Sequence, residues 1–114
     1  KAGAADFLEK PVKPEALLKI VRQLIEKNLR EREAKARRSV LREKYETLTD
    51  REKDVLQQVA TGATNKVIAG NLGIAEQTVK IHRGSAMYKL GIHTAVDAYE
   101  TLSTLGISVK KAAE

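Results

Sequence analysis

The stretch "LTDREKDVLQQVATGATNKVIAGNLGIAEQTVKIHRGSAMYKLGI", residues 48–92, decides the fold of this chain. Threonine and glycine divide it into segments whose apolar residues recur with a helical period. Thr49 stands three residues before Glu52, which is a capping box at the start of a helix. Thr64 caps a second short segment, and Gly73 ends it. The stretch therefore predicts two short helices joined by a turn, an arrangement typical of a helix-turn-helix.

Two further helices follow the same rules. Residues 76–90 form the third predicted helix, which Gly91 ends. Thr94, with Asp97 three residues later, opens a fourth helix that runs toward Gly106. No strand pattern and no internal repeat is visible in this part of the sequence. The predicted fold class is all-α, with four helices joined by short connections.

A long helix is predicted before this bundle. Pro14 suits a first helical position, and no glycine or proline follows it until Gly62. The first half of this segment has an apolar stripe with helical spacing: Leu17, Ile20, Val21, Leu24 and Ile25. The second half offers charged pairs four residues apart, Glu26–Arg30, Glu31–Lys35 and Glu33–Arg37, which favour a solvated spacer helix. A continuous helix over residues 14–44 would be about 45 Å long.

Composition excludes several classes of protein. The 114 residues include no cysteine and two histidines, so a disulfide framework, a thiolate metal site and a histidine cage are all excluded. No apolar run approaches the roughly 20 residues of a membrane span. No constellation of nucleophile, base and orienting acid indicates an enzyme. We therefore expect a cytoplasmic protein that is not an enzyme and has no cofactor, no metal and no membrane partner.

The net charge of +6 does not by itself locate a nucleic-acid site. Residues 1–44 carry 13 Lys/Arg against 7 Asp/Glu, whereas residues 45–114 carry 8 against 8. The function must therefore be read from local pattern rather than from total charge.

The predicted third helix has two unlike faces. Val79, Ala86 and Leu90 share one side, which we expect to face the core. The opposite side combines polar, cationic and apolar residues with a glycine: Gln77, Lys80, Ile81, Gly84 and Tyr88. An exposed apolar side chain can contact a thymine methyl group in the major groove, and lysine and glutamine can donate to base edges. This side is the predicted DNA-reading surface, although a purely structural helical hairpin would match part of the pattern.

Gly84 costs this helix roughly 1 kcal/mol relative to alanine. One explanation is that a residue without a side chain lets the helix backbone approach DNA closely. The alternative is that Gly84 relieves crowding against a neighbouring helix.

Several side chains beside the reading surface are candidates for phosphate contacts, which fix register without reading sequence: Lys66, Thr78, His82, Arg83 and Lys89. For His82, a half-buried structural role is an equal alternative. Arg83 lies toward the core edge, where a salt bridge with a neighbouring helix is equally expected.

The motifs "LTDRE", "NKVIAGNLGI", "TVKIHR" and "KLGI" together resemble the LuxR-type helix-turn-helix over residues 48 to about 107. The opening "GAADFLEKPV" resembles the end of a response-regulator receiver domain, in which Phe7 would be the aromatic residue of the last strand and Lys10 the switch lysine. Together they resemble two-component response regulators of the FixJ/NarL class. This resemblance implies a four-helix domain whose third helix enters the major groove and whose fourth helix makes a dimer, here through Val96, Tyr99 and Leu102.

The same resemblance divides the chain into three parts: residues 1–13 as a receiver remnant, 14–44 as the last receiver helix continuing into a linker, and 45–114 as the DNA-binding domain. Two positions depart from the family pattern, since Ala75 replaces a capping hydroxyl residue and Gly70 replaces an acidic residue. The strands that would carry the phosphoacceptor aspartate are not in this sequence. A sensor kinase would therefore act only through the missing part of the receiver.

The expected partners are double-stranded DNA, a second copy of the chain, and RNA polymerase as an additional contact. Leu17, Val21 and Leu24 would meet their copies in a two-fold contact between linker helices. The alternative function is a sigma-factor-like or other helix-turn-helix module that binds protein. A DNA-binding domain is distinguished from it by steep loss of DNA affinity as salt rises.

Overall fold

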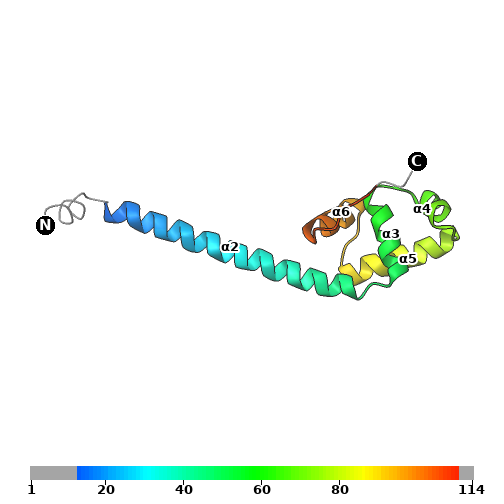
Figure 1. Cartoon of the computed structure of the whole chain (residues 1–114), viewed down its shortest axis with the longest axis horizontal. Coiled ribbons are helices and arrows are strands. Elements are labelled where there is room, and N and C mark those ends of the chain that lie inside the picture. Colours follow the sequence, from blue (N-terminus) through cyan, green and yellow to red (C-terminus); the bar gives the residue numbers. More distant parts are fainter. Residues whose placement is uncertain (1–12, 111–114) are drawn as a thin grey trace. The chain divides into compact units, whose positions relative to one another are not determined.

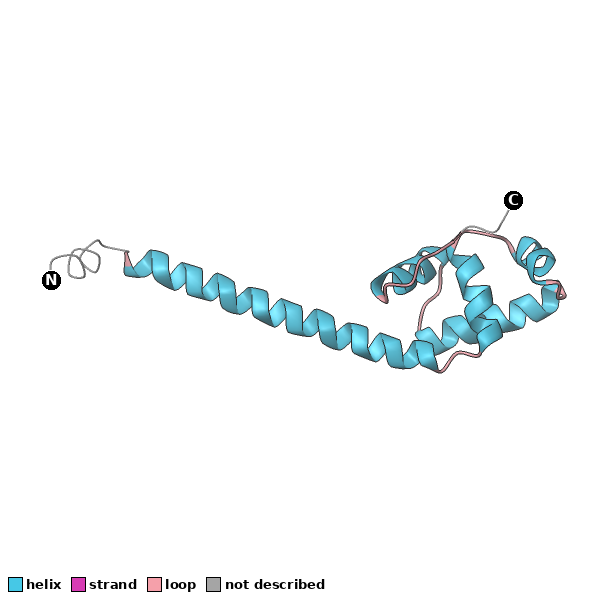
Figure 2. Ribbon diagram, viewed as in Figure 1, coloured by secondary structure: helices cyan, strands magenta, loops and turns pink. Residues whose placement is uncertain are grey.

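The structure is a computed structural model that describes residues 13–110. These residues form five α-helices and no strand (Figure 2): α2 (Pro14–Glu46), α3 (Asp50–Ala60), α4 (Asn65–Leu72), α5 (Glu76–Leu90) and α6 (Ala95–Thr104). The predicted all-α class is confirmed. The expected strand residue Phe7 and switch lysine Lys10 lie outside the described residues.

The chain divides into two compact units, Lys1–Ala36 and Arg37–Glu114. In the second unit α3 packs against α4, α5 and α6, and α4 also packs against α5 (Figure 1). The core that these helices share is apolar: Leu48, Val55, Leu56, Val59, Ile68, Ala69, Val79, Ala86, Met87, Leu90, Ala98 and Leu102. Helix α3 is therefore the centre of the bundle.

The ends of the helices follow the local signals in the sequence. Thr49 and Thr94 each form the capping box that their spacing predicts, with Glu52 and Asp97 respectively. Ala75 precedes α5 without a side-chain cap. The predicted loss of a cap at the start of α5 is thus confirmed.

The last turns of α2 belong to the second unit. Leu41 and Tyr45 are partly buried against the core. The Arg42 guanidinium donates to the Leu105 carbonyl at the end of α6, with 3.1 Å between Nη2 and O. Lys53 of α3 lies 4.9 Å from the centre of the Tyr45 ring. These contacts fasten the end of α2 to the bundle.

The preceding part of α2 contrasts with the bundle, because the helix contains no buried residue. Its apolar stripe is about half exposed and is wider than predicted, since Leu18 and Leu29 join it. The three predicted i,i+4 ion pairs are absent. The ion pairs among residues 13–110 are Arg51–Asp54, Lys53–Glu46 and Lys89–Glu52. The charged side chains of residues 26–37 are exposed, and an exposed pair gains too little to fix two long side chains.

Candidate nucleic-acid interface

Helix α5 has the two faces that its sequence predicts. Val79, Ala86 and Leu90 are buried. The opposite side, called here the reading face, is exposed and consists of Gln77, Lys80, Ile81, Gly84 and Tyr88. Ile81 is 62% exposed and Tyr88 is 87% exposed. Ile81 and Tyr88 are thus exposed to solvent on the same face as Lys80, and no described residue of the bundle covers this face.

Gly84 lies in open space. A Cβ atom built there would meet no atom within 4 Å outside its own helix backbone and chain neighbours. Relief of crowding therefore does not explain this glycine in the described part of the chain. Close approach of the helix backbone to DNA, the other explanation offered by the sequence, stays a prediction.

A turn and a hydrogen bond fix α5 relative to α4. Gly73 ends α4 in the left-handed conformation, with φ of 68°. The Arg83 guanidinium then donates to the Asn65 side-chain oxygen in the first turn of α4, with 3.1 Å between Nη1 and Oδ1. The expected salt bridge for Arg83 is corrected, because the partner is a neutral amide.

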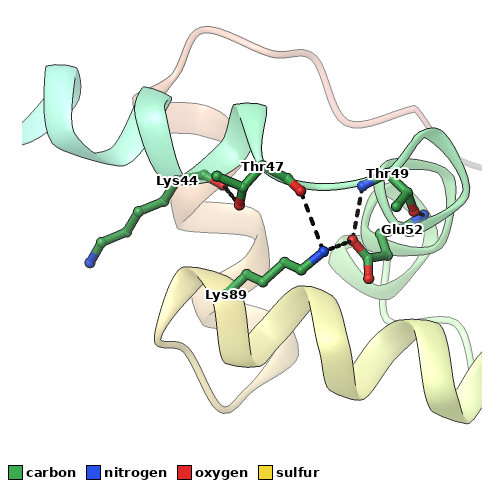
Figure 3. Close-up of polar contacts among 5 residues, drawn as sticks. All are labelled: Lys44, Thr47, Thr49, Glu52 and Lys89. Carbon is green, nitrogen blue, oxygen red and sulfur yellow. Dashed lines mark hydrogen bonds and ion pairs between the residues drawn. The ribbon is translucent and has the colours of Figure 1, made fainter.

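Lys89 is engaged inside the domain (Figure 3). Its ammonium group lies 2.8 Å from Glu52 Oε1 and 3.3 Å from the Thr47 carbonyl oxygen. The Lys89 amino group thus connects the end of α5 to the start of α3, and its contact with phosphate stays a prediction. Glu52 was recognised in the sequence as a capping residue, but no local signal relates it to a lysine 37 residues away.

The Glu52 carboxyl is almost fully buried and also accepts from the Thr49 amide at 2.9 Å. Burial raises the pKa of this carboxyl, but hydrogen bonds from Lys89, Ser85 and Thr49, together with the Lys89 charge, outweigh burial. The pKa falls from 4.5 to about 2. Glu52 therefore carries a negative charge wherever the bundle is folded at neutral pH.

The remaining candidates divide by exposure. Lys66 is exposed at the start of α4, while Thr78 and His82 are partly buried on the flank of α5. Val96 and Tyr99 are exposed on α6, at 65% and 51%. Leu102 is fully buried, so its assignment to a dimer surface is corrected.

On α2, Leu17, Val21 and Leu24 are exposed as expected. No described helix is long and apolar enough to cross a membrane. Within residues 13–110, no group of three or more histidine, aspartate or glutamate side chains is arranged to hold a metal ion.

Residues 46–102 match the family described as "Bacterial regulatory proteins, luxR family". The chain is 44% identical over 108 residues to "Nodulation protein W" of Bradyrhizobium diazoefficiens, covering 95% of this chain and 48% of that protein. It is 38% identical over 110 residues to "Response regulator protein TodT" of Pseudomonas putida, covering 96% and 48%. The chain thus spans about half the length of these relatives.

The fold is also similar to a solved structure, that of the response regulator StyR. The TM-score is 0.67 at 38% sequence identity, covering 82% of this chain and 48% of that one. The matched family is a DNA-binding domain of transcription regulators and not an enzyme. On the match over residues 46–102, the chain belongs to the LuxR family of bacterial regulatory proteins.

Proposed function

We propose that this chain binds double-stranded DNA sequence-specifically, with α5 in the major groove, as the output part of a two-component transcriptional regulator. The observation that carries the proposal is the reading face, where Ile81 and Tyr88 stand exposed beside Lys80. The opposite face of the same helix is buried in the core. A helix held by one face presents the other to a groove, as in other helix-turn-helix domains.

The reading face supplies the chemistry that bases require. Lys80 and Gln77 donate to base edges, and Ile81 contacts a thymine methyl group. Gly84 lets the helix backbone come close to the DNA. Tyr88 completes the face near the end of the helix.

Phosphate contacts come from side chains that the fold leaves available. Lys66, Thr78 and His82 are our candidates, because none of them forms a side-chain hydrogen bond with another described residue. Arg83 adds positive charge at the groove edge while its hydrogen bond to Asn65 holds it in place. Such contacts set affinity and register, whereas the reading face sets sequence preference.

We propose that the protein acts as a dimer. On α6, Val96 and Tyr99 form an exposed apolar pair that a second copy can cover. The stripe of α2, through Leu17, Val21 and Leu24, is a second surface for a copy of the chain. Two copies bound side by side would read two half-sites of the operator.

The role of the whole protein is a further part of the proposal. Relatives such as TodT are named response regulators and are about twice as long as this chain. A sensor kinase would act through a receiver part that this sequence does not include. The bound domain would contact RNA polymerase in the cytoplasm, where bacterial DNA lies.

The test of the proposal is substitution on the reading face. Lys80→Ala and Ile81→Ala should each weaken binding to a duplex selected from a random pool by about 1–3 kcal/mol, without lowering the melting temperature. Lys19→Ala and Val40→Ala are matched controls, because both residues are exposed on α2. Unchanged affinity and sequence preference in both reading-face variants would refute the assignment of α5 to the groove.

The dimer contact on α2 is tested by light scattering at several concentrations. The variant Leu17→Asp, Val21→Asp, Leu24→Asp should shift the chain from dimer to monomer. A control with three aspartates at Lys19, Gln23 and Arg30, which lie off the stripe, should remain a dimer. A monomeric intact chain, or a dimer that the stripe variant leaves intact, would refute this contact.

A further inference from the structure

The final turns of α2 carry a positive charge that lies outside the matched family domain, which begins at residue 46. Residues 37–44 contain four basic residues and one acidic residue: Arg37, Arg38, Arg42, Lys44 and Glu43. This segment belongs to the same compact unit as the reading face. Its charge is therefore fixed to the domain rather than carried on a separate part of the chain.

Most of this charge is free to meet a partner. Arg42 is engaged with the Leu105 carbonyl. Arg37, Arg38 and Lys44 are exposed, and none of them takes part in the ion pairs found among residues 13–110. No acidic side chain of the described bundle neutralises them.

The position of these residues relates them to the reading face. The bond from the Lys89 ammonium to the Thr47 carbonyl joins the end of α5 to the chain that directly follows α2. Figure 3 shows that the Lys44 side chain points away from the Lys89–Glu52 pair. Tyr88, the neighbour of Lys89, is the last residue of the reading face. Lys44 therefore lies just beyond the end of the helix that reads the groove.

Arg37 lies on the same face of α2 as Lys44. It stands seven residues before Lys44, which on an α-helix places both residues on one face about 10 Å apart. Arg38 widens the basic surface beside them. A helix lying in the major groove, which is about 12 Å wide, is flanked by the phosphates of both strands.

We propose that Arg37, Arg38 and Lys44 form a phosphate-binding surface that contacts the DNA backbone next to the groove occupied by α5. This inference rests on the proposed function. The occupant is the phosphate backbone of the same duplex, because this cationic surface lies outside the helix that we place in the groove, where phosphates rather than base edges are within reach. The surface adds affinity and salt dependence but no sequence preference.

The experiment compares the full chain with the variant Arg37→Gln, Arg38→Gln, Lys44→Gln. Binding is measured by fluorescence anisotropy over a salt series, with the duplex that the intact chain selects and with a random-sequence duplex. Each lost phosphate contact should reduce the slope of log affinity against log salt by about 0.9, so the variant slope should fall by about 2–3 with both duplexes. The ranking of duplex sequences should not change.

The control variant Lys13→Gln, Lys19→Gln, Arg22→Gln removes the same charge from the other end of α2. It should leave the slope nearly unchanged. An equal fall in the two variants would show a general effect of net charge and overturn the inference, as would an unchanged slope in the first variant. If the intact chain binds neither duplex in a salt-dependent way, the proposed function itself fails. Thermal melts followed by circular dichroism establish that each variant folds.

Discussion

Apolar side chains are buried in α3 but exposed in α2. In α3, an 11-residue helix, Val55, Leu56 and Val59 are at most 1% exposed. In α2, a 33-residue helix, Leu17 and Leu24 remain 52% and 56% exposed. Both helices have apolar residues at helical spacing. Spacing therefore selects an apolar face, whereas burial depends on whether another element packs against that face.

The apolar stripe of α2 is also wide. Leu18 and Leu29 extend it beyond the narrow seam that a simple two-stranded coiled coil requires. Such a face suits a broad partner surface as well as a second helix. Residues 14–36 of α2 depend on helix propensity and local contacts, whereas the bundle is stabilised by its core.

The largest expected effect is the loss of stability when a buried leucine of α3, rather than an exposed leucine of α2, is replaced by alanine. Leu56→Ala removes a fully buried side chain from α3 and should lower the free energy of unfolding by about 2–5 kcal/mol. Leu24→Ala, the matched change in α2, should cost less than about 1 kcal/mol at a protein concentration low enough to keep the chain monomeric, because the side chain is then half exposed. Urea unfolding of the two variants measures both values. Equal losses would show that α2 is buried against a partner in solution.

The second-largest expected effect is the contribution of the buried Glu52 carboxylate to the free energy of unfolding. The pKa of Glu52 is about 2 in the folded chain and 4.5 in the unfolded chain. Its carboxylate therefore stabilises the bundle fully above about pH 4.5. That contribution is lost as the pH falls from there through about 2, and it amounts to at most about 3 kcal/mol. Urea unfolding across this pH range should show the loss in the intact chain. Glu52→Gln should weaken the bundle at neutral pH and flatten the pH dependence.

The control for that prediction is Glu33→Gln in α2. This carboxylate is exposed and has no ion-pair partner among the described residues. Its substitution should leave both the stability and the pH dependence within about 0.5 kcal/mol of the intact chain. A large effect of Glu33→Gln would indicate that the charges of α2 do form pairs in solution.

The smallest expected effect is the gain in stability when a helical glycine is replaced by alanine. Gly70 and Gly84 both lie in helices, are exposed and have open space around a built Cβ atom. Alanine at either position should raise the free energy of unfolding by about 0.5–1 kcal/mol. Only Gly84→Ala should weaken DNA binding, and Gly84→Leu should weaken it further. Normal binding by both Gly84 variants would contradict close approach of the α5 backbone to DNA.

Much of the fold could be predicted because its signals are local. The caps at Thr49, Thr64 and Thr94 each act on an amide three residues away, and all three occur as predicted. The buried and exposed faces of α5 follow from a period of 3.6 residues and were also predicted correctly. The extension of α2 to Glu46 lies only two residues beyond the predicted end.

The limits of the bundle helices and the exposed face of α5 follow from the sequence, because caps and periodicity act within a few residues. The partners of individual side chains follow from the packing of the helices. Arg83 meets Asn65 across 18 residues, Lys89 meets Glu52 across 37, and Arg42 meets Leu105 across 63. The burial of Leu102 and the exposure of the α2 stripe likewise depend on which helices pack together. Periodicity within one helix identifies an apolar face, but the element that covers this face comes from a distant part of the sequence.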